Sequence, residues 1–243
     1  MFKFSPRLVA LYRKESRKPV YNIINPFVYY RRSRKINVSE AARGTIFFVA
    51  HSTSEIDDLT DWEEYINQLK KIPEQFHPID VCLHPTDMNK GLNLIFEQHG
   101  YKIVTAGDLA SYQYTINFYD ILRNYRYSMS NLLGSYLFYS VEMGIPFSLY
   151  GEEPKYFNKA DNNIEKGNYV SYKTDNTYRK AKGLFSGFYT VISKEQAEFV
   201  NYELGINDTI SRGKACWLVY TAVFLFALRN PRMFLNTLRG RYN

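Results

Sequence analysis

Residues 127–151, YSMSNLLGSYLFYSVEMGIPFSLYG, divide into three segments that decide the fold. Residues 127–130 alternate in polarity and end in a serine, a residue type that caps helices. Residues 131–144 follow with apolar side chains close to the 3.6-residue period of a helix, at Leu133, Leu137, Val141 and Met143. A glycine and a proline then end the helix, and residues 147–150 have the pattern of a buried strand. The stretch therefore predicts a strand–helix–strand unit.

The start of this predicted helix is rich in small and polar residues, namely Ser130, Asn131, Gly134 and Ser135. Such a start leaves backbone N–H groups free, allows close approach, and adds hydroxyl and amide donors. Together with the positive end of the helix dipole, these groups favour a phosphate or pyrophosphate. An ordinary capped helix that binds no ligand explains the same residues, so capping alone leaves both interpretations open.

Three further apolar runs predict strands at residues 46–50, 79–83 and 101–106. Helical patterns follow them, at residues 57–69, 92–98 and 117–125. Strands that alternate with helices indicate a parallel sheet with right-handed crossovers. The predicted fold class is therefore α/β, with a Rossmann-like parallel sheet and helices on both faces.

Polar residues follow the predicted strands at the ends where open α/β sheets bind ligands. His51 and Ser52 follow the first strand, and His84 and Pro85 follow the second. His51 could donate to a phosphate or carry a proton, and it could equally be a structural cap. Pro85 could simply end the loop. Glu152 follows the strand at 147–150, where a solvated loop carboxylate is the alternative to a ligand contact.

The central stretch resembles the donor-binding half of GT-B glycosyltransferases, closest to the bacterial ones that build lipopolysaccharide and capsule glycans. The resemblance rests on Ser-Asn-x-x-Gly-Ser at 130–135, an aromatic-rich helix, Met-Gly-Ile-Pro at 143–146 and a strand ending in Tyr-Gly at 150–151. It covers roughly residues 44–151 in element order. His84-Pro85 is similar to the HP motif of bacterial GT-B sialyltransferases. The motifs are short, and nucleotide-sugar epimerases share the outline of the first.

The resemblance implies a role for each of these positions. The helix start would hold the phosphates of a nucleotide-sugar, and His84 would contact the phosphate of a CMP-linked donor. Glu152 would bind ribose hydroxyls. Such enzymes are generally metal-independent, so the resemblance implies no metal and no cofactor beyond the UDP- or CMP-linked donor substrate.

The chain departs from this family in what precedes the donor-binding half. A complete enzyme has an acceptor-binding domain there, whereas about 43 residues stand here, below the roughly 100 or more of a usual domain. We expect a basic arm or linker at 1–43 and a nucleotide-sugar-binding domain at 44–243, with an insertion at 155–187 and a closing helix at 216–228. Because the catalytic base of such enzymes usually lies in the other domain, no catalytic residue is assigned.

Charge and composition suggest where the chain works. The net charge is +7, and residues 3–35 contain ten basic residues against one acidic residue. This bias favours an anionic partner such as a nucleotide or the inner membrane leaflet, and less a nucleic acid. Two isolated cysteines and no secretory signal indicate the cytoplasm, with peripheral membrane contact through the arm and the C-terminal helix.

The apolar run at 216–228 has 13 residues without a charge, fewer than the about 20 that span a bilayer. It fits a buried closing helix or one in the membrane interface, and we expect a core helix that extends into a basic, membrane-facing end.

The predicted function is glycosyl transfer from a nucleotide-sugar to a glycan or lipid-linked acceptor, in surface polysaccharide or lipopolysaccharide biosynthesis. One alternative is a non-catalytic donor-binding subunit that needs a partner chain or a second copy. Another is an epimerase-like protein. The sequence contains no HExxH, Walker A or GxSxG motif.

Overall fold

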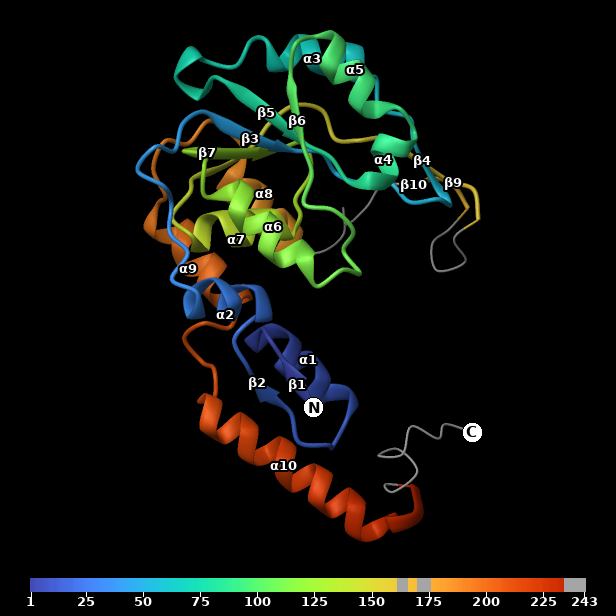
Figure 1. Ribbon diagram of the computed structural model, residues 1–243, viewed down its shortest axis with the longest axis vertical. Helices are drawn as coiled ribbons and strands as arrows, with labels where there is room; N and C mark the ends of the chain where they lie inside the picture. Colours follow the sequence, from blue (N-terminus) through green and yellow to red (C-terminus); the bar gives the residue numbers. More distant parts are fainter. Residues whose placement is uncertain (161–165, 170–175, 234–243) are drawn as a thin grey trace. The chain divides into compact units, whose positions relative to one another are not determined.

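The computed structural model describes residues 1–160, 166–169 and 176–233, and the chain forms two units. Met1–Asn25 and Tyr202–Asn243 make up the first, which we call the terminal unit. Pro26–Asn201 make up the second, which we call the sheet unit (Figure 1). This division differs from the predicted boundary after residue 43, because the chain joins the sheet unit at Pro26.

The sheet unit is an α/β fold with a five-stranded, fully parallel sheet in the order β6-β5-β3-β7-β8. Its elements are α2 (Pro26–Ser33), β3 (Thr45–Phe48), β4 (Ile56–Asp58), α3 (Trp62–Leu69), the 3₁₀ turn η1 (Glu74–Phe76), β5 (Ile79–Cys82), α4 (Pro85–Asn89), α5 (Leu92–Gln98), β6 (Lys102–Val104), α6 (Gln113–Leu122), β7 (Tyr127–Ser130), α7 (Ser135–Glu142), β8 (Phe147–Leu149), β9 (Tyr156–Asn158), β10 (Gly167–Tyr169), α8 (Asn176–Phe185) and α9 (Lys194–Glu203), which ends in the terminal unit. The predicted Rossmann-like fold class is confirmed.

Strand β3 occupies the centre of the sheet because all four of its residues suit complete burial. Its one polar side chain, Thr45, donates a hydrogen bond to the carbonyl of Phe76 at 2.6 Å. In the register of the sheet, Phe48 stands opposite Cys82 of β5 and Ser130 of β7. The carboxyl ends of these three strands therefore lie level with one another.

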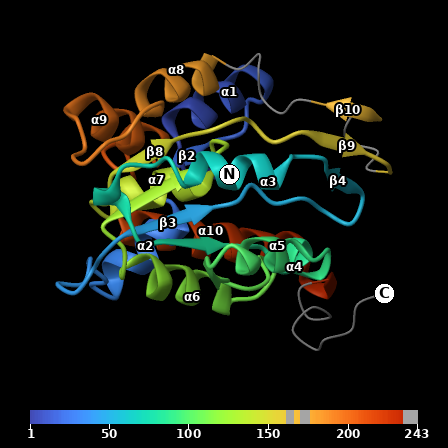
Figure 2. The ribbon, with the colours of Figure 1, turned by 90° about the horizontal axis from the view of Figure 1, so that it is seen from above.

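Helices cover both faces of the sheet, with α3 and α5 on one side and α6, α7 and α8 on the other (Figures 1 and 2). Consecutive residues of β3 supply the two cores, because side chains alternate between the faces of a strand. Phe47 stacks on Tyr65 of α3, with ring centroids 5.4 Å apart. Phe48 stacks on Phe118 of α6 at 5.8 Å and on Tyr136 of α7 at 4.9 Å. These five aromatic rings thus belong to the two cores.

Most predicted strands and helices appear within one to three residues of their expected bounds. Several helix starts differ by four or five residues, among them that of α7, which begins at Ser135 rather than at residue 131. Helix α3 begins at Trp62 rather than at residue 57, because residues 56–58 form β4 and Asp61 caps the helix through the N–H of Glu64 at 3.0 Å. Helix α6 begins at Gln113, earlier than predicted.

The predicted insertion at 155–187 contains regular structure. Strand β9 pairs antiparallel with β4 on one side and with β10 on the other, which makes a separate three-stranded sheet. Helix α8 then packs on β8. Residues 161–165 and 170–175 of the predicted insertion lie outside the described residues. The described part of the predicted insertion thus forms two strands and a helix.

The terminal unit joins the two ends of the chain. Its elements are β1 (Phe2–Lys3), α1 (Pro6–Glu15), β2 (Tyr21–Asn22) and α10 (Arg212–Arg229). The Arg7 Nε group donates to both carboxylate oxygens of Glu203, at 3.2 and 3.1 Å. The Asn22 amide donates to the carbonyl of Gly205 at 3.0 Å. Residues 1–25 therefore fold with the C-terminal segment, and the predicted arm at 1–43 is not one segment.

Helix α10 extends beyond the predicted closing helix at both ends, and none of its residues is buried. The expectation of a core helix here is therefore wrong. Across residues 1–160, 166–169 and 176–233, no helix is both long and apolar enough to cross a membrane.

The ion pair between α2 and α7 gives a test of the packing. Arg31 holds Glu142 through two 2.7 Å hydrogen bonds, and the two side chains are 12% and 1% exposed. We expect Glu142→Ala to lower the free energy of unfolding by about 3 kcal/mol, because it leaves a buried guanidinium without its counter-charge. Urea titration followed by Trp62 fluorescence, in a Trp217→Phe background, measures this change.

The matched control is Arg32→Ala. Arg32 also contacts Glu142, at 2.9 Å, but its side chain is 44% exposed. Its removal should cost less than about 1 kcal/mol. Equal losses for the two variants would contradict the account.

Candidate functional site

The carboxyl edge of the parallel sheet contains a cavity of about 100 Å³. Its walls come from the segments that follow three neighbouring strands and from the start of two helices, and the lining residues are Phe48, Val49, His51, Cys82, Leu83, His84, Ala106, Gly107, Leu109, Tyr114, Ser135 and Tyr136. This is the edge at which open α/β sheets bind ligands. Both histidines predicted to contact a ligand lie in its wall.

His84 is the N-cap of α4, and Pro85 is the first residue of that helix. Proline is favoured at this position because its missing N–H would have no helical partner. The ring Nδ1 of His84 accepts the N–H of Thr86 at 3.2 Å. A neutral His84 therefore carries its proton on Nε2, where it is free to donate. Pro85 is not among the lining residues, so its role is structural.

His51 has the opposite arrangement. Its Nδ1 lies 3.1 Å from the carbonyl oxygen of Ser52, which can only accept, so Nδ1 carries the proton. The Nε2 atom of a neutral His51 is therefore basic. The ring centroids of His51 and His84 are 5.1 Å apart. The site thus combines a histidine N–H donor with a neighbouring basic nitrogen.

The environment of His84 lowers the pKa of its imidazole below the usual value of 6.5. Desolvation by burial is the largest cause, and the nearby charge of protonated His51 acts in the same direction. The carboxylates of Asp87 and Asp108 act against this shift. The neutral, Nε2-protonated form of His84 therefore predominates at neutral pH.

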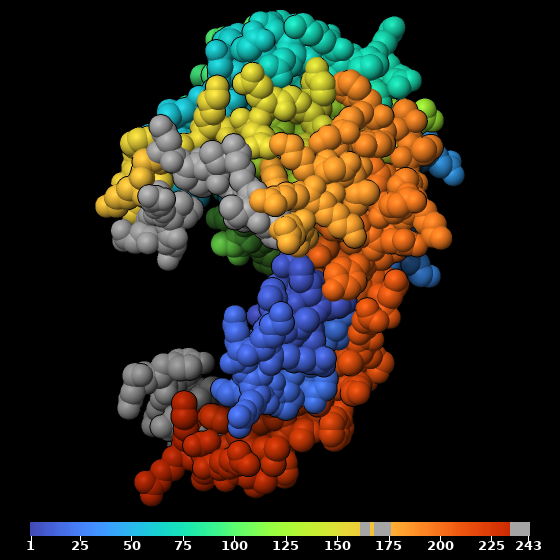
Figure 3. Space-filling model, turned by 180° about the vertical axis from the view of Figure 1, so that it is seen from behind, coloured from blue at the N-terminus to red at the C-terminus, as the bar shows by residue number. Residues whose placement is uncertain are grey.

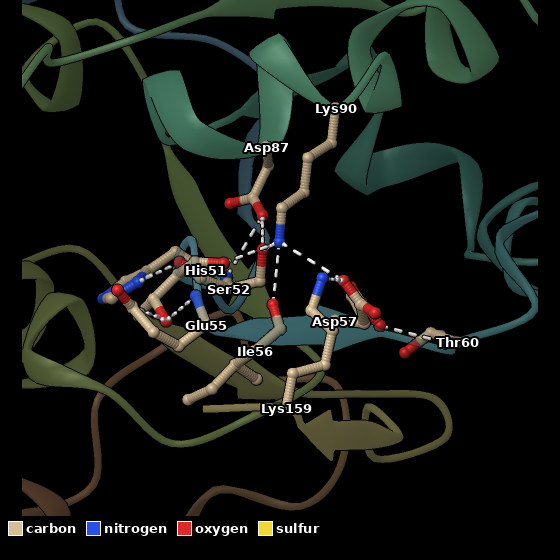
Figure 4. A network of polar contacts seen from close by, with 11 residues as sticks. His51, Ser52, Glu55, Ile56, Asp57, Thr60, Asp87, Lys90 and Lys159 are labelled. Carbon is tan, nitrogen blue, oxygen red and sulfur yellow. Dashed lines mark hydrogen bonds and ion pairs between the residues drawn. The ribbon is translucent and has the colours of Figure 1, made fainter. Parts of the chain in front are cut away.

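A partly buried polar network fixes the loop that carries His51 (Figure 4). The Ser52 hydroxyl donates to Asp87 at 2.5 Å and accepts from the Lys90 ammonium at 2.9 Å. Lys90 also donates to the carbonyls of Thr53 and Ile56, at 2.6 and 2.7 Å. These bonds join the loop after β3 to helix α4, and so set His51 against His84.

Ser52 is not a ligand contact in this arrangement, contrary to its predicted role. Ser52 is 2% exposed, and its hydroxyl is hydrogen-bonded to Asp87 and Lys90. The sequence interpretation missed Asp87 and Lys90 because it did not predict α4. Their spacing of three residues, directly after His84-Pro85, is the signal that could have placed them on one helix face.

A tyrosine side chain occupies the phosphate-binding position predicted at the start of α7. The helix begins at Ser135, with Gly134 as its N-cap, so Ser130 and Asn131 precede it. The Ser130 hydroxyl donates to Tyr136 Oη at 2.8 Å and accepts the N–H of Leu132 at 3.2 Å. A Cβ atom on Gly134 would lie 2.6 Å from the Tyr136 ring, so the glycine makes room for this ring.

Ser130 and Asn131 are 0% and 1% exposed, and so neither side chain is open to a ligand in this structure. Both polar atoms of the Asn131 amide are buried without a hydrogen-bond partner among the described residues. Ser130, Asn131 and Gly134 therefore do not form the phosphate contacts predicted for them. Ser135 alone of this group lines the cavity.

Two other groups near this edge do not take part. Glu152 lies exposed after β8, with its carboxylate 3.8 Å from the Lys155 ammonium, and does not line the cavity. The Cys82 thiol does line it, but burial raises its pKa to about 12, so it is not a nucleophile at neutral pH. In the described residues, no group of three or more His, Cys, Asp or Glu side chains could hold a metal ion.

A larger hollow, of about 460 Å³, lies beside the edge strand β6 and helix α6. Its lining residues are Lys102, Val104, Thr105, Asn117, Asp120, Ile121, Asn124 and Tyr125. It lacks a histidine and lies away from the central strands. We therefore place the candidate site at the smaller cavity, which both His51 and His84 line.

Comparison of the chain with protein-family models, with curated proteins and with solved structures finds no match.

The coupling of the two histidines gives a direct test. In ¹H–¹⁵N NMR spectra of the imidazole rings, we expect His84 to titrate with a midpoint below 6.5. His51→Gln should raise that midpoint, because it removes a neighbouring positive charge. His99→Gln, which removes an imidazole that pairs with Glu63, is the matched control and should leave it unchanged. A midpoint at or above 6.5, or one indifferent to His51→Gln, would contradict the site geometry.

Proposed function

We propose that the sheet unit binds a nucleotide-sugar by its phosphate at the carboxyl edge of the sheet, and that the protein is a glycosyltransferase. The observation that carries the proposal is the pair of imidazoles, His51 and His84, supplied by neighbouring strands to one cavity. The resemblance to donor-binding halves of bacterial GT-B enzymes supports the sugar-nucleotide as the ligand class. Transfer to a glycan or lipid-linked acceptor follows from the same resemblance.

The chemistry of the pair suits a leaving phosphate. When the bond to the sugar breaks, negative charge develops on the phosphate oxygens. The Nε2–H of His84 can donate to them in a partly dehydrated site, where a fixed donor is worth more than in water. The basic Nε2 of His51 can take up a proton and become a second donor.

The cavity is too small for a whole nucleotide-sugar, so the phosphate and the nucleoside occupy different places in our proposal. Ligand pockets for whole organic molecules usually measure about 300–1,000 Å³. The cavity here, at about 100 Å³, suits a phosphate group rather than a whole nucleotide. Leu109 and Tyr112, in the segment after β6, are 51% and 81% exposed. In our proposal the nucleoside lies over these two side chains, where a base can stack on the tyrosine ring.

A thermal-shift panel of UDP-, GDP-, CMP- and dTDP-sugars tests the binding step. A ligand at 100 times its Kd stabilises the native state by about 2.7 kcal/mol, which raises Tm by several degrees. We expect one donor class to give such a shift. His51→Gln/His84→Gln should abolish it.

The matched control is His77→Gln/His99→Gln. These are the other two histidines of the chain; they precede β5 and β6 and so lie at the opposite edge of the sheet. The control variant should keep the full shift. A thermal shift that persists in His51→Gln/His84→Gln, or that disappears in the control variant, would show that His51 and His84 do not bind the ligand.

Turnover separates an enzyme from a binding subunit. Release of free nucleotide from the effective donor, measured with the purified chain alone, would establish catalysis. Binding without release, even with added glycan acceptors, would overturn the proposal of a self-sufficient transferase while leaving the donor site intact.

A further inference from the structure

Helix α10 has an apolar surface that the other described residues of the terminal unit leave exposed. Residues 216–228 contain no charged side chain, and none of the 18 residues of α10 is buried. Eight of its large apolar side chains are exposed, and Figure 3 draws the helix in red. A helix that is apolar on all sides normally lies in a protein core or in lipid.

The most exposed of these side chains form a stripe. They are Trp217 (64%), Tyr220 (74%), Phe224 (63%) and Leu228 (62%). Their spacing of three and four residues places them on one face of the helix. Contiguous apolar patches of this kind mark interaction sites. The presence of both tryptophan and tyrosine is typical of a surface that meets the boundary between water and lipid.

The charges around the stripe indicate an anionic partner. Arg212 and Lys214 stand at the start of α10, and Arg229 and Arg232 at its end; no acidic residue follows Asp208. By sequence, the terminal unit holds twelve Lys and Arg residues against three Asp and Glu. The sheet unit holds 19 against 21. The entire positive excess of the chain therefore belongs to the unit that carries the apolar helix.

The same charges argue against a second copy of α10 as the partner. Both ends of the helix are basic, so pairing two copies brings cations together in either the parallel or the antiparallel orientation. Like charges at such an interface cost free energy and select against the partner. An anionic lipid surface meets both requirements at once, since it accepts the apolar stripe and neutralises the cations.

We propose that α10 docks the protein on a bilayer of anionic phospholipids, lying in the plane of the interface. Trp217, Tyr220, Phe224 and Leu228 enter the boundary between head groups and acyl chains. The arginines and the lysine at the two ends contact the lipid phosphates. Buried apolar area and electrostatic attraction both contribute to binding of this kind. The docking is independent of the nucleotide site, because it uses only residues of the terminal unit.

Vesicle binding of the full chain tests this directly. In a Trp62→Phe background, Trp217 is the single tryptophan and reports on α10 alone. We expect its emission to shift to the blue with vesicles of 70% phosphatidylcholine and 30% phosphatidylglycerol. Brominated acyl chains should quench it. The apparent affinity should be at least tenfold weaker for pure phosphatidylcholine and should fall on raising the salt from 0.1 to 0.5 M.

Two variants separate the apolar and the charged contributions. Phe224→Glu/Leu228→Glu should lose binding to both kinds of vesicle. Arg229→Glu/Arg232→Glu should reduce binding to anionic vesicles at least tenfold while leaving the weak binding to neutral ones. The matched controls lie in the sheet unit. They are Leu59→Glu/Leu94→Glu, two leucines that are 54% and 56% exposed, and Lys71→Glu/Lys194→Glu. Both controls should bind as the unmodified chain does.

Three results would overturn the proposal. One is absence of binding to anionic vesicles. Another is binding that the Phe224→Glu/Leu228→Glu variant retains. The third is a self-associated protein, measured by sedimentation velocity, that becomes monomeric in this variant and binds no vesicle, which would make a second copy the occupant of α10. Because the assay contains no nucleotide, its failure would leave the donor-site proposal untouched.

Discussion

The parallel pairing of β3 with β5 and β7 is the constraint on which the rest of the sheet unit depends. Because the strands are parallel, the carboxyl ends of all five lie at the same edge of the sheet, and crossover segments return the chain to the opposite edge. The register of β3 places Phe48 level with Cys82 and Ser130, and so brings the segments that follow these residues together. The two histidines of the site, His51 and His84, meet for this reason, although they lie 33 positions apart in the sequence.

The site shows how local folding requirements and ligand chemistry can compete for the same residues. The turn before α7 has the composition of an anion-binding helix start, but Tyr136 fills it from within and is held by stacking on Phe48. His84 caps α4 through Nδ1, and that same bond directs its proton to Nε2. In the first case the structural role excludes the ligand. In the second it prepares the side chain for one.

The elements that could be predicted from the sequence are those that depend on local patterns. The strands and the helix at 92–98 were predictable because their apolar runs and periodicity are read along the chain. The small sheet of β4, β9 and β10 was not, because its strands are three residues long and β4 and β9 are about 100 residues apart. The burial of Ser130 and Ser52 was hidden for a related reason. A serine at a strand end serves equally as a cap, a network member or a ligand contact, and only its neighbours in space decide.

Helix α10 illustrates the limit of periodicity in another way. Its apolar residues predict a helix correctly, but an apolar run does not say which surface will cover it. The division of charge between the two units supplies that information only after the units are known. The donor site and the helix then appear as separate features, one on a nearly neutral sheet unit and the other on a basic terminal unit.

The most direct measurement of the central claim is an NMR titration of the ¹⁵N-labelled chain with CMP and with UDP. The account predicts that the largest shift changes fall on the imidazoles of His51 and His84 and on the amides of Gly107 and Ser135. Changes confined to the hollow beside β6 and α6 or to the terminal unit would contradict it, as would the absence of any change at millimolar nucleotide.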